Sequence, residues 1–433
     1  MLDWVWSFSA RARTADEVAA QRAAKLERMR ALLDALQRPE RAFPALLVAG
    51  TKGKGSTVAM IGACLSAAGL RTGRYTSPHL VNWRERACID AQPISTEAVL
   101  ELAQPIRRAV EQMPSHLGAP TTFEVGTAFA LAYFARAQVD VAVLEVGTGG
   151  RFDATNVVEP LAAAIAPISF DHTATLGESL SAIAWHKAGI MRAARPAVAA
   201  PQPDEARLVL EREADRIGAH LEEVGREWRW SRSGDGIRVE SSDAGFESLT
   251  TTVALRGEHQ RDNATTAVAT LHAVRSQLAV PSAAIQRGLS TVDWPGRLQV
   301  LSERPLIVLD GAHNGASAEA LRRALRDEFR FDRLLLVLGI SEGKDARGVV
   351  SALAPDAEAV YLTRAHHERS AAPAELEPLV RSVAPRRKVT AYDELGTALE
   401  AAWADAGAGD LVLVTGSLFL VGEALVWSRR SRR

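Results

Sequence analysis

Apolar runs of strand length alternate with amphipathic stretches along most of the 433-residue chain. Residues 15–37 predict a helix with one apolar face, because apolar side chains recur there at spacings of three and four among Arg and Glu. Pro39 and Pro44 end this helix before the apolar run Leu46–Ala49, which predicts a buried strand. The small-residue segment Val58–Ala68 then predicts a second helix.

This alternation continues through the first half of the chain and predicts a mostly parallel sheet with helices on both faces. Further strands are expected at 70–75, 139–144 and 161–168. Between residues 217 and 256 the pattern changes to short strands separated by Ser, Gly and Asp turns. That change predicts a small antiparallel addition to the parallel sheet.

The pattern breaks again at Trp294–Leu298, which gives two expected domains, residues 1–295 and residues 296–433. Strand–helix alternation restarts beyond the break, with apolar runs at 307–309, 334–338 and 411–414. The expected fold class is therefore α/β. It has a P-loop-type, mostly parallel N-terminal sheet domain with a small antiparallel addition, and a smaller, Rossmann-like C-terminal α/β domain.

Composition narrows the class of protein. Hydrophobic residues make up 47% of the chain and charged residues 24%, as in ordinary soluble globular proteins. The net charge of −1 gives no overall field that favours nucleic acid, and the basic run 428–433 is interpreted as a solvated end. Two cysteines fit a reducing compartment. The apolar patch Trp4–Phe8 is too short for a signal peptide, and no apolar window reaches membrane-spanning length. We expect a cytoplasmic monomer without nucleic-acid or membrane partners.

The segment after the first strand carries the clearest candidate chemistry. Residues Gly50–Thr57 place three glycines within six residues between a predicted strand and a predicted helix. In that context backbone N–H groups and a helix N-terminus hold phosphate. Lys54 would reach the outer phosphates, and Ser56 or Thr57 would lie near magnesium. The match to G-x-x-x-x-G-K-[ST] is imperfect, since Val48 replaces its first glycine, and a plain connecting turn is the alternative.

Polar residues also stand at the ends of other predicted strands: Glu145, Asp171, His172, Asp310, His313 and Ser417. Singly, each has a structural interpretation, as a solvated acid, a helix-cap neighbour or a satisfied turn histidine. Lys187, taken alone on a predicted helix, fits a solvent-facing lysine better than a functional one. The carboxyl ends of parallel strands, however, form the ligand edge of an open α/β sheet. Their common location favours a nucleotide site in which an acid such as Glu145 holds magnesium.

The motifs taken together resemble the folylpolyglutamate synthase and dihydrofolate synthase family, within the Mur-type ATP-dependent amide ligases. The likeness covers about residues 22–425. The motifs stand, in the family's order, at Gly50–Ser56, Thr76–Leu80, Thr122–Gly126, Leu144–Asn156, Asp171–Thr173, Lys187–Ile190, Gly257–Gln260, Trp294–Arg297, Asp310–Asn314 and Gly416–Glu423.

The resemblance implies an ATP and magnesium site between the two domains. The residues that would contact ATP are Thr51, Lys52, Gly53, Lys54, Gly55, Ser56, Asn263, Arg297 and Asp310. The implied magnesium ligands are Ser77, Glu145, His172 and Lys187, and the last three are the implied catalytic residues. Family members carry the lysine as a carbamate, which turns a cation into an anion able to hold a second magnesium ion.

The resemblance also implies the other substrates. The pterin-side positions are Thr121, Thr122, Phe123, Glu124, Phe152, Asp153 and Ala154, and those near the incoming L-glutamate are His313 and Ser417. ATP would phosphorylate a carboxylate of dihydropteroate or of a reduced folate, and the amino group of glutamate would then displace phosphate.

Three positions depart from the family pattern, and the third makes the acceptor less certain than the type of reaction. Lys52 replaces the usual asparagine, His186 replaces the acid that commonly precedes Lys187, and residues 22–25 lack a stretch that touches the pterin in two-activity members. Arg151, in contrast, favours members that accept dihydropteroate. A related ligase for a non-folate carboxylate stays open as an alternative. A nucleotide-binding module without ligase activity is disfavoured by the polar residues of the second domain.

Overall fold

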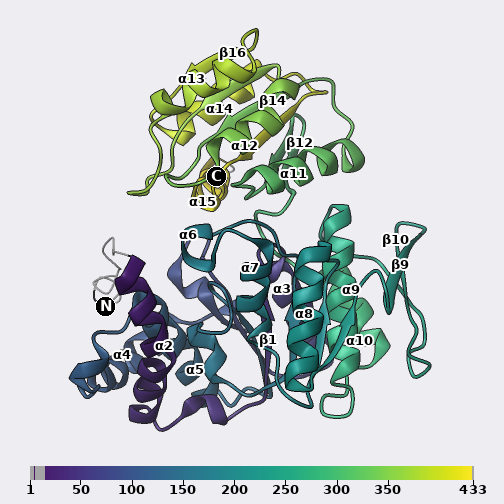
Figure 1. The fold of residues 1–433 in the computed structure, drawn as a ribbon. Helices are drawn as coiled ribbons and strands as arrows, with labels where there is room; N and C mark the ends of the chain where they lie inside the picture. Colours follow the sequence, from purple (N-terminus) through teal and green to yellow (C-terminus); the bar gives the residue numbers. More distant parts are fainter. Residues whose placement is uncertain (1–3, 5–14, 432–433) are drawn as a thin grey trace. The chain divides into compact units, whose positions relative to one another are not determined.

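The computed structural model describes Trp4 and residues 15–431, which cluster into two compact units (Figure 1). Unit 1 comprises residues up to 79, 84–254 and 260–292, and unit 2 comprises 80–83, 255–259 and 293 onward. The predicted boundary at residue 295 had placed two short segments, 80–83 and 255–259, in the first domain. In the structure Leu80 lies against Gly296 and Gly422, within unit 2. The predicted patch at residues 5–8 and the last two residues of the basic run lie outside the described residues.

Unit 1 contains an eight-stranded sheet in the order β4-β3-β2-β5-β1-β6-β7-β8. The strands from β2 to β8 in this order run parallel, while β3 and β4 are antiparallel at one edge. The strands are β1 (Ala45–Ala49), β2 (Thr72–Tyr75), β3 (Ala87–Ile89), β4 (Gln92–Pro93), β5 (Val141–Glu145), β6 (Pro160–Ile165), β7 (Pro196–Ala199) and β8 (His220–Glu223).

Helices cover both faces of this sheet, which explains why β1 and β5 are continuous apolar runs rather than alternating ones. Every residue of β1 is buried. The helices are α2 (Ala15–Ala35), α3 (Lys54–Ala67), α4 (Thr96–Glu111), α5 (Thr122–Arg136), α6 (Thr173–Leu176), α7 (Leu180–Ala188), α8 (Asp204–Ile217), α9 (Glu258–Ala273) and α10 (Ser282–Thr291). Short 3-10 turns include η1 (Pro39–Arg41) and η4 (Ala154–Val157). Among the described residues, no helix combines the length and the apolarity that a membrane crossing requires.

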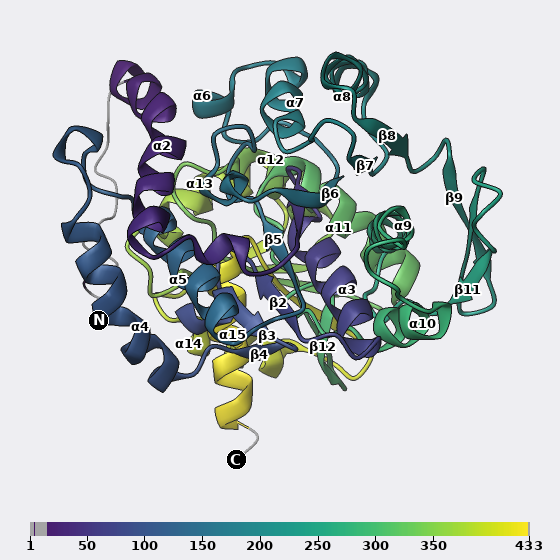
Figure 2. The same ribbon diagram turned by 90° about the horizontal axis from the view of Figure 1, so that it is seen from below.

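The predicted antiparallel addition is a three-stranded sheet in the order β11-β10-β9. Its strands are β9 (Trp228–Ser233), β10 (Gly236–Ser241) and β11 (Leu249–Thr251). Figure 2 shows this sheet at the margin of unit 1, beside α10.

Unit 2 is a six-stranded sheet in the order β12-β13-β17-β14-β15-β16, parallel except for β12. Alternate residues of β14 enter two separate apolar clusters, so both faces of the sheet are covered. The strands are β12 (Gln299–Glu303), β13 (Leu306–Leu309), β14 (Leu334–Leu338), β15 (Ala359–Leu362), β16 (Lys388–Ala391) and β17 (Leu411–Thr415). The helices are α11 (Gly315–Glu328), α12 (Ala346–Leu353), α13 (Pro373–Val383), α14 (Leu395–Asp405) and α15 (Leu418–Ser431). The predicted fold class is confirmed.

Candidate active site

The predicted phosphate loop follows the carboxyl end of β1, inside the unit 1 sheet. The Thr51 N–H donates to the carbonyl of Pro167 at 2.9 Å, and the Thr51 hydroxyl donates to the carbonyl of Ser169 at 3.0 Å. Gly53 has a φ of 77°, and a Cβ there would collide with the side-chain oxygen of Asn263. Glycine is therefore required at position 53, and Asn263, from α9, lies directly against the loop.

Three predicted residues converge on the carboxyl edge because β2, β5 and β1 are neighbours in the sheet. Lys54 is the first residue of α3, and its Nζ lies 3.9 Å from Oε1 of Glu145. Glu145 is the last residue of β5 and is 5% exposed. Its Oε2 accepts a hydrogen bond from the N–H of Ser77 at 3.1 Å. The structure thus gathers a cation, a buried carboxylate and a serine at one point.

Lys187 reaches the same loop from α7. Its side chain is buried, and Nζ donates to the carbonyl of Gly50 at 2.7 Å. Burial, followed by the nearby Lys54 ammonium, lowers the pKa of Lys187 to about 7. The interpretation of Lys187 as a solvent-facing lysine is therefore wrong.

Lys52 and His172 both lie near Asp171. Burial lowers the pKa of Lys52 to about 8, although the Asp171 carboxylate opposes that shift. His172 caps α6 with a φ of 52°, and its Nε2 lies 3.9 Å from Oδ1 of Asp171. Its side chain is 48% exposed, unlike the buried Glu145 and Lys187.

Within the described residues, no group of three or more His, Cys, Asp or Glu side chains is arranged to hold a metal ion. Of the four predicted magnesium ligands, Glu145 and His172 are of these residue types, and the other two are Ser77 and Lys187. A buried carboxylate beside a phosphate loop fits the oxygen ligands that magnesium prefers. An ammonium at Lys187 would repel a divalent cation. The set therefore fits magnesium when Lys187 carries an anionic group.

The predicted pterin-side residues lie at the start of α5 and in the loop after β5. Thr121 and Glu124 form a capping box, in which the Thr121 hydroxyl accepts from the Glu124 N–H and the Glu124 carboxylate accepts from the Thr121 N–H. Glu124 is fully buried and pairs with Arg28 of α2 at 2.9 Å. This geometry gives Glu124 a role in holding α5, beginning at Thr122, against α2. Arg28 was not identified from the sequence, where no local pattern links it to a residue 96 positions away.

Two half-buried aromatic rings line the same region. The Phe123 ring lies against the backbone of Gly147, with Nζ of Lys25 6.0 Å from its centroid. The Phe152 ring lies 6.1 Å from Trp185. Flat, partly exposed rings offer stacking surfaces for a pterin.

Asp153 and Ala154 shape the loop rather than present side chains to solvent, since both are buried. The Asp153 carboxylate accepts from the N–H groups of Thr148 and Thr155, at 3.1 Å each, and from the Thr155 hydroxyl at 2.8 Å.

Unit 2 carries its own group of predicted residues at the carboxyl end of β13. The Asp310 carboxylate accepts from the N–H groups of Leu298 and Ala312, at 3.0 and 2.9 Å. Nδ1 of His313 lies 2.8 Å from the carbonyl oxygen of Gly311. Arg297 donates to the carbonyl of Gly296 at 2.9 Å.

Ser417 lies at the end of the neighbouring strand β17, and two further residues after strands of the same sheet were missed by the sequence analysis. The Ser417 hydroxyl is 3.2 Å from that of Ser341, which follows β14. Thr363, after β15, is fully buried, and its hydroxyl has no hydrogen-bond partner within the described part of the chain. The signal that the sequence offered for Ser341 and Thr363 was that each follows a buried strand.

Two family models match the chain. The Mur ligase middle domain matches residues 48–271, and the Mur ligase glutamate ligase domain matches residues 296–418. A dihydrofolate synthase/folylpolyglutamate synthase from Bacillus subtilis is 32% identical over 92% of this chain and 93% of its own length. This chain belongs to the dihydrofolate synthase/folylpolyglutamate synthase family of Mur ligases. The chain spans about half the length of other curated relatives. One is a probable bifunctional folylpolyglutamate synthase/dihydropteroate synthase of Halobacterium salinarum, 38% identical over 88% of this chain and 47% of its own length.

Solved structures of the same family share the fold. FolC from Escherichia coli in complex with DHPP and ADP matches with a TM-score of 0.85 and 31% identity, over 100% of this chain and 97% of that one. The Yersinia pestis bifunctional enzyme complexed with AMPPNP and Mn ion matches with a TM-score of 0.81 and 33% identity, over 93% and 92%.

His186, one of the departures from the family pattern, lies at the end of a chain of contacts that begins at Arg151. The Arg151 guanidinium pairs with Glu213 at 2.6 Å and lies 4.1 Å from the ring centroid of Trp185. Trp185 in turn makes an edge contact with His186, the residue before Lys187, at 5.0 Å between ring centroids. Arg151 therefore positions the end of α7 that carries Lys187.

Proposed function

We propose that this chain is an ATP-dependent ligase that joins L-glutamate to the carboxylate of a pterin-bearing acceptor, dihydropteroate or a reduced folate. The observation that carries the proposal is the convergence of Lys54, Glu145 and the buried Lys187 on the Gly50–Thr57 loop. The names of the relatives and the glutamate ligase domain support the choice of substrates.

The reaction needs an activated carboxylate, because a carboxylate ion resists attack by an amine. A carboxylate oxygen of the acceptor attacks the γ-phosphorus of ATP, and ADP leaves. The amino nitrogen of glutamate then attacks the acyl carbon of the acyl phosphate and loses a proton, and inorganic phosphate departs with the former carboxylate oxygen. Charge neutralisation and alignment of the reacting groups supply the acceleration.

In this scheme the loop residues Thr51, Lys52, Gly53, Lys54, Gly55 and Ser56 hold the phosphates. The N-terminus of α3, which begins at Lys54, would offer backbone N–H groups and the Lys54 ammonium to the phosphates. Lys52 adds a second cation. Asn263 lies close enough to Gly53 to fix the entry of the loop into α3.

A divalent metal would be held by Ser77, Glu145, His172 and Lys187, and when bound it would neutralise phosphate charge. We propose that Lys187 is carbamylated in the active protein. Its burial near the Lys54 ammonium would bring two cations together, whereas a carbamate there would balance the charge of Lys54 and of a bound metal ion. The carbamate forms when the neutral amine attacks carbon dioxide and loses a proton.

Unit 2 supplies the proposed glutamate side. His313 and Ser417 stand at the carboxyl ends of neighbouring parallel strands, with Ser341 3.2 Å from Ser417. Asp310 and Arg297 are the proposed nucleotide contacts of this unit. On the acceptor side, Phe123 and Phe152 offer the stacking faces, while Thr121, Thr122, Glu124, Asp153 and Ala154 shape the surrounding backbone.

The free, buried thiols of Cys64 and Cys88 support a cytoplasmic location.

The test is a turnover assay with purified protein, ATP, magnesium and L-glutamate, in which dihydropteroate and tetrahydrofolate are compared side by side. We expect phosphate release that depends on both glutamate and acceptor, with a product heavier by one glutamyl residue. Release that needs no acceptor would identify an ATPase. Release that occurs only with a non-pterin carboxylate would retain the ligase and overturn the acceptor.

A further inference from the structure

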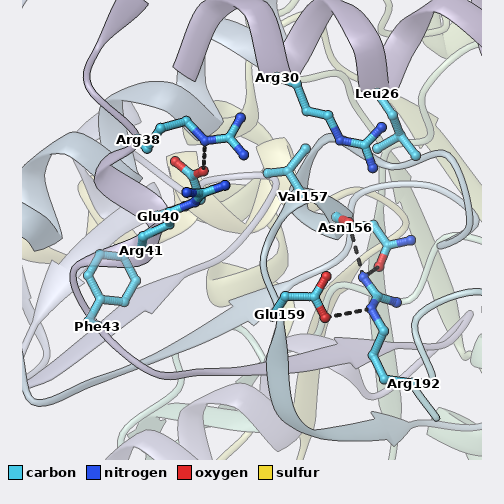
Figure 3. A pocket seen from close by; sticks show the side chains of 10 residues that line it. All are labelled: Leu26, Arg30, Arg38, Glu40, Arg41, Phe43, Asn156, Val157, Glu159 and Arg192. Atoms are coloured by element: carbon cyan, nitrogen blue, oxygen red, sulfur yellow. Dashed lines mark hydrogen bonds and ion pairs between the residues drawn. The ribbon is translucent and has the colours of Figure 1, made fainter. Parts of the chain in front are cut away.

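A hollow of about 580 Å³ opens at the amino-terminal edge of the unit 1 sheet (Figure 3). Phe43 and Glu159, in its wall, lie just before the first residues of β1 and β6, whereas the phosphate loop follows the last residue of β1. Five residues of extended strand span about 16 Å. The hollow and the phosphate loop are therefore separate, and the volume is typical of small-molecule sites.

Four arginines line this hollow, and two of them already have partners. Arg192 donates to backbone carbonyls just after α7 and around the end of η4, and at 2.9 Å to the side chain of Asn156. It also pairs with Glu159 at 3.3 Å. Arg38 pairs with Asp34 at 2.9 Å and with Glu40 at 3.0 Å. These contacts fix the shape of the wall.

The other two arginines are uncommitted. Arg30 comes from α2 and Arg41 from η1, and neither side chain makes a hydrogen bond or ion pair with any residue that the structure describes. In Figure 3 Arg30 descends from the helix above and ends near Leu26, to one side of Val157, while Arg41 lies beside Glu40. Two guanidinium groups around one hollow repel each other, and an anion between them relieves that repulsion.

Glu40 is the second feature of the hollow that points to a ligand, after the two arginines. Its side chain is 4% exposed, and Oε1 is held by Arg38. The other oxygen, Oε2, is buried and has no hydrogen-bond partner among the described residues. Because Oε2 is sealed in the wall, a ligand hydroxyl or amine satisfies this costly buried acceptor only when the Glu40 side chain turns toward the hollow.

We propose that this hollow binds a small organic anion that carries at least two negative charges and a hydrogen-bond donor. Arg30 and Arg41 would each grip a carboxylate or phosphate group in the bidentate manner of guanidinium. The donor would reach Oε2 of Glu40, and the carbon skeleton would contact Phe43 and Val157. Carboxylates and phosphates share this chemistry.

The test is calorimetric titration of the full chain, in metal-free buffer at physiological salt, with three probes. Citrate has three carboxylates and a hydroxyl, tricarballylate has the same carboxylates without the hydroxyl, and 3-phosphoglycerate has a phosphate, a carboxylate and a hydroxyl. We expect 1:1 binding of citrate or of 3-phosphoglycerate, and weaker binding of tricarballylate than of citrate. The tighter of the two hydroxyl-bearing probes identifies the preferred anionic group.

Matched variants locate the site. Arg30→Gln and Arg41→Gln, both at exposed positions, should each weaken binding about tenfold or more, a loss of roughly 1.4 kcal/mol. Arg107→Gln, at an exposed position on α4, should bind like the parent. Lys54→Ala should also bind like the parent, because the phosphate loop is not involved.

Several results would overturn the proposal. These are no binding of citrate or 3-phosphoglycerate, a loss in Arg107→Gln equal to that in Arg30→Gln, and loss of binding in Lys54→Ala. Equal affinity for citrate and tricarballylate would remove the role given to Glu40.

Discussion

The side-chain amine of Lys187 donates a hydrogen bond to the carbonyl oxygen of Gly50 at 2.7 Å. This contact joins α7 to the first residue of the phosphate loop across 137 positions of sequence. Lys187 is thereby held, away from water, next to Lys54 and on the same sheet edge as Glu145.

Substitution of Lys187 tests the proposed carbamate. Lys187→Ala should lower turnover about a hundredfold or more, since an anion that aligns phosphate and metal is lost. Acetate or formate should restore part of that activity by supplying a carboxylate. Lys187→Arg should not be rescued, because guanidinium stays cationic and fills the space. Depletion of carbon dioxide should inactivate the parent, and bicarbonate should restore it. Turnover within a few-fold of the parent in both variants would contradict this role.

Removal of the Lys54 ammonium tests the phosphate loop. Lys54→Ala should reduce ATP-dependent phosphate release about a hundredfold or more, because the substitution removes the ammonium that lies 3.9 Å from Glu145 at the phosphate loop. Thermal unfolding should stay close to that of the parent. Lys388→Ala, which removes an exposed lysine paired with Asp405, is the matched control. Near-normal turnover in Lys54→Ala would rule out the phosphate assignment.

Neutralisation of Glu145 tests the metal site without changing its shape. Glu145→Gln should raise the magnesium concentration that gives half-maximal turnover by about tenfold or more, because the amide offers no negative charge to the ion. Glu101→Gln, at an exposed ion pair with Arg136, should leave the magnesium dependence unchanged. If both variants titrate like the parent, Glu145 does not bind the metal.

The sequence places several candidate residues of unit 1 at one sheet edge because their signals are local. Gly50–Thr57 and Glu145 directly follow buried strands, and a strand end in a parallel sheet is a position that the hydrophobic pattern reveals. Lys187 and Asn263 lie within helices, where a functional residue carries no periodic signature. Only the family resemblance pointed to them.

The hydrophobic pattern of the sequence does not reveal tertiary contacts between distant segments. The Arg28–Glu124 ion pair depends on how α2 packs against α5. The hollow lined by Arg30 and Arg41 depends on where α2 and η1 lie, and no local spacing encodes either arrangement. Strand β8 was missed because its sequence, His-Leu-Glu-Glu, is polar and lies at a sheet edge. Strands β7 and β15 are only four residues long, too short for a clear periodicity.

The Arg333–Asp410 pair predicts how the stability of unit 2 depends on pH. Hydrogen bonds from Arg333 hold the pKa of Asp410 below its usual range. A carboxyl whose pKa is lower in the folded state than in the unfolded state contributes stability above the unfolded pKa, about 3.9, and that contribution is lost as pH falls through the folded pKa.

Denaturant unfolding at neutral and at acidic pH measures this contribution. Asp410→Asn should lose roughly 1.5–3 kcal/mol at pH 7, and the difference from the parent should shrink as the pH falls below about 4. Asp204→Asn, at an exposed acid, should match the parent at both pH values. A loss in Asp410→Asn that is the same at both pH values would assign the effect to packing instead of charge.

The central claim is that phosphate leaves from an acyl phosphate formed on the acceptor carboxylate, and oxygen transfer measures it directly. Dihydropteroate or tetrahydrofolate labelled with ¹⁸O in the reacting carboxylate is incubated with the protein, ATP, magnesium and L-glutamate, and the released phosphate is analysed by mass spectrometry. The account predicts one ¹⁸O atom in each phosphate and one retained in the new amide. Phosphate released without label would mean that water, not the acceptor, takes the phosphoryl group, and would contradict the account.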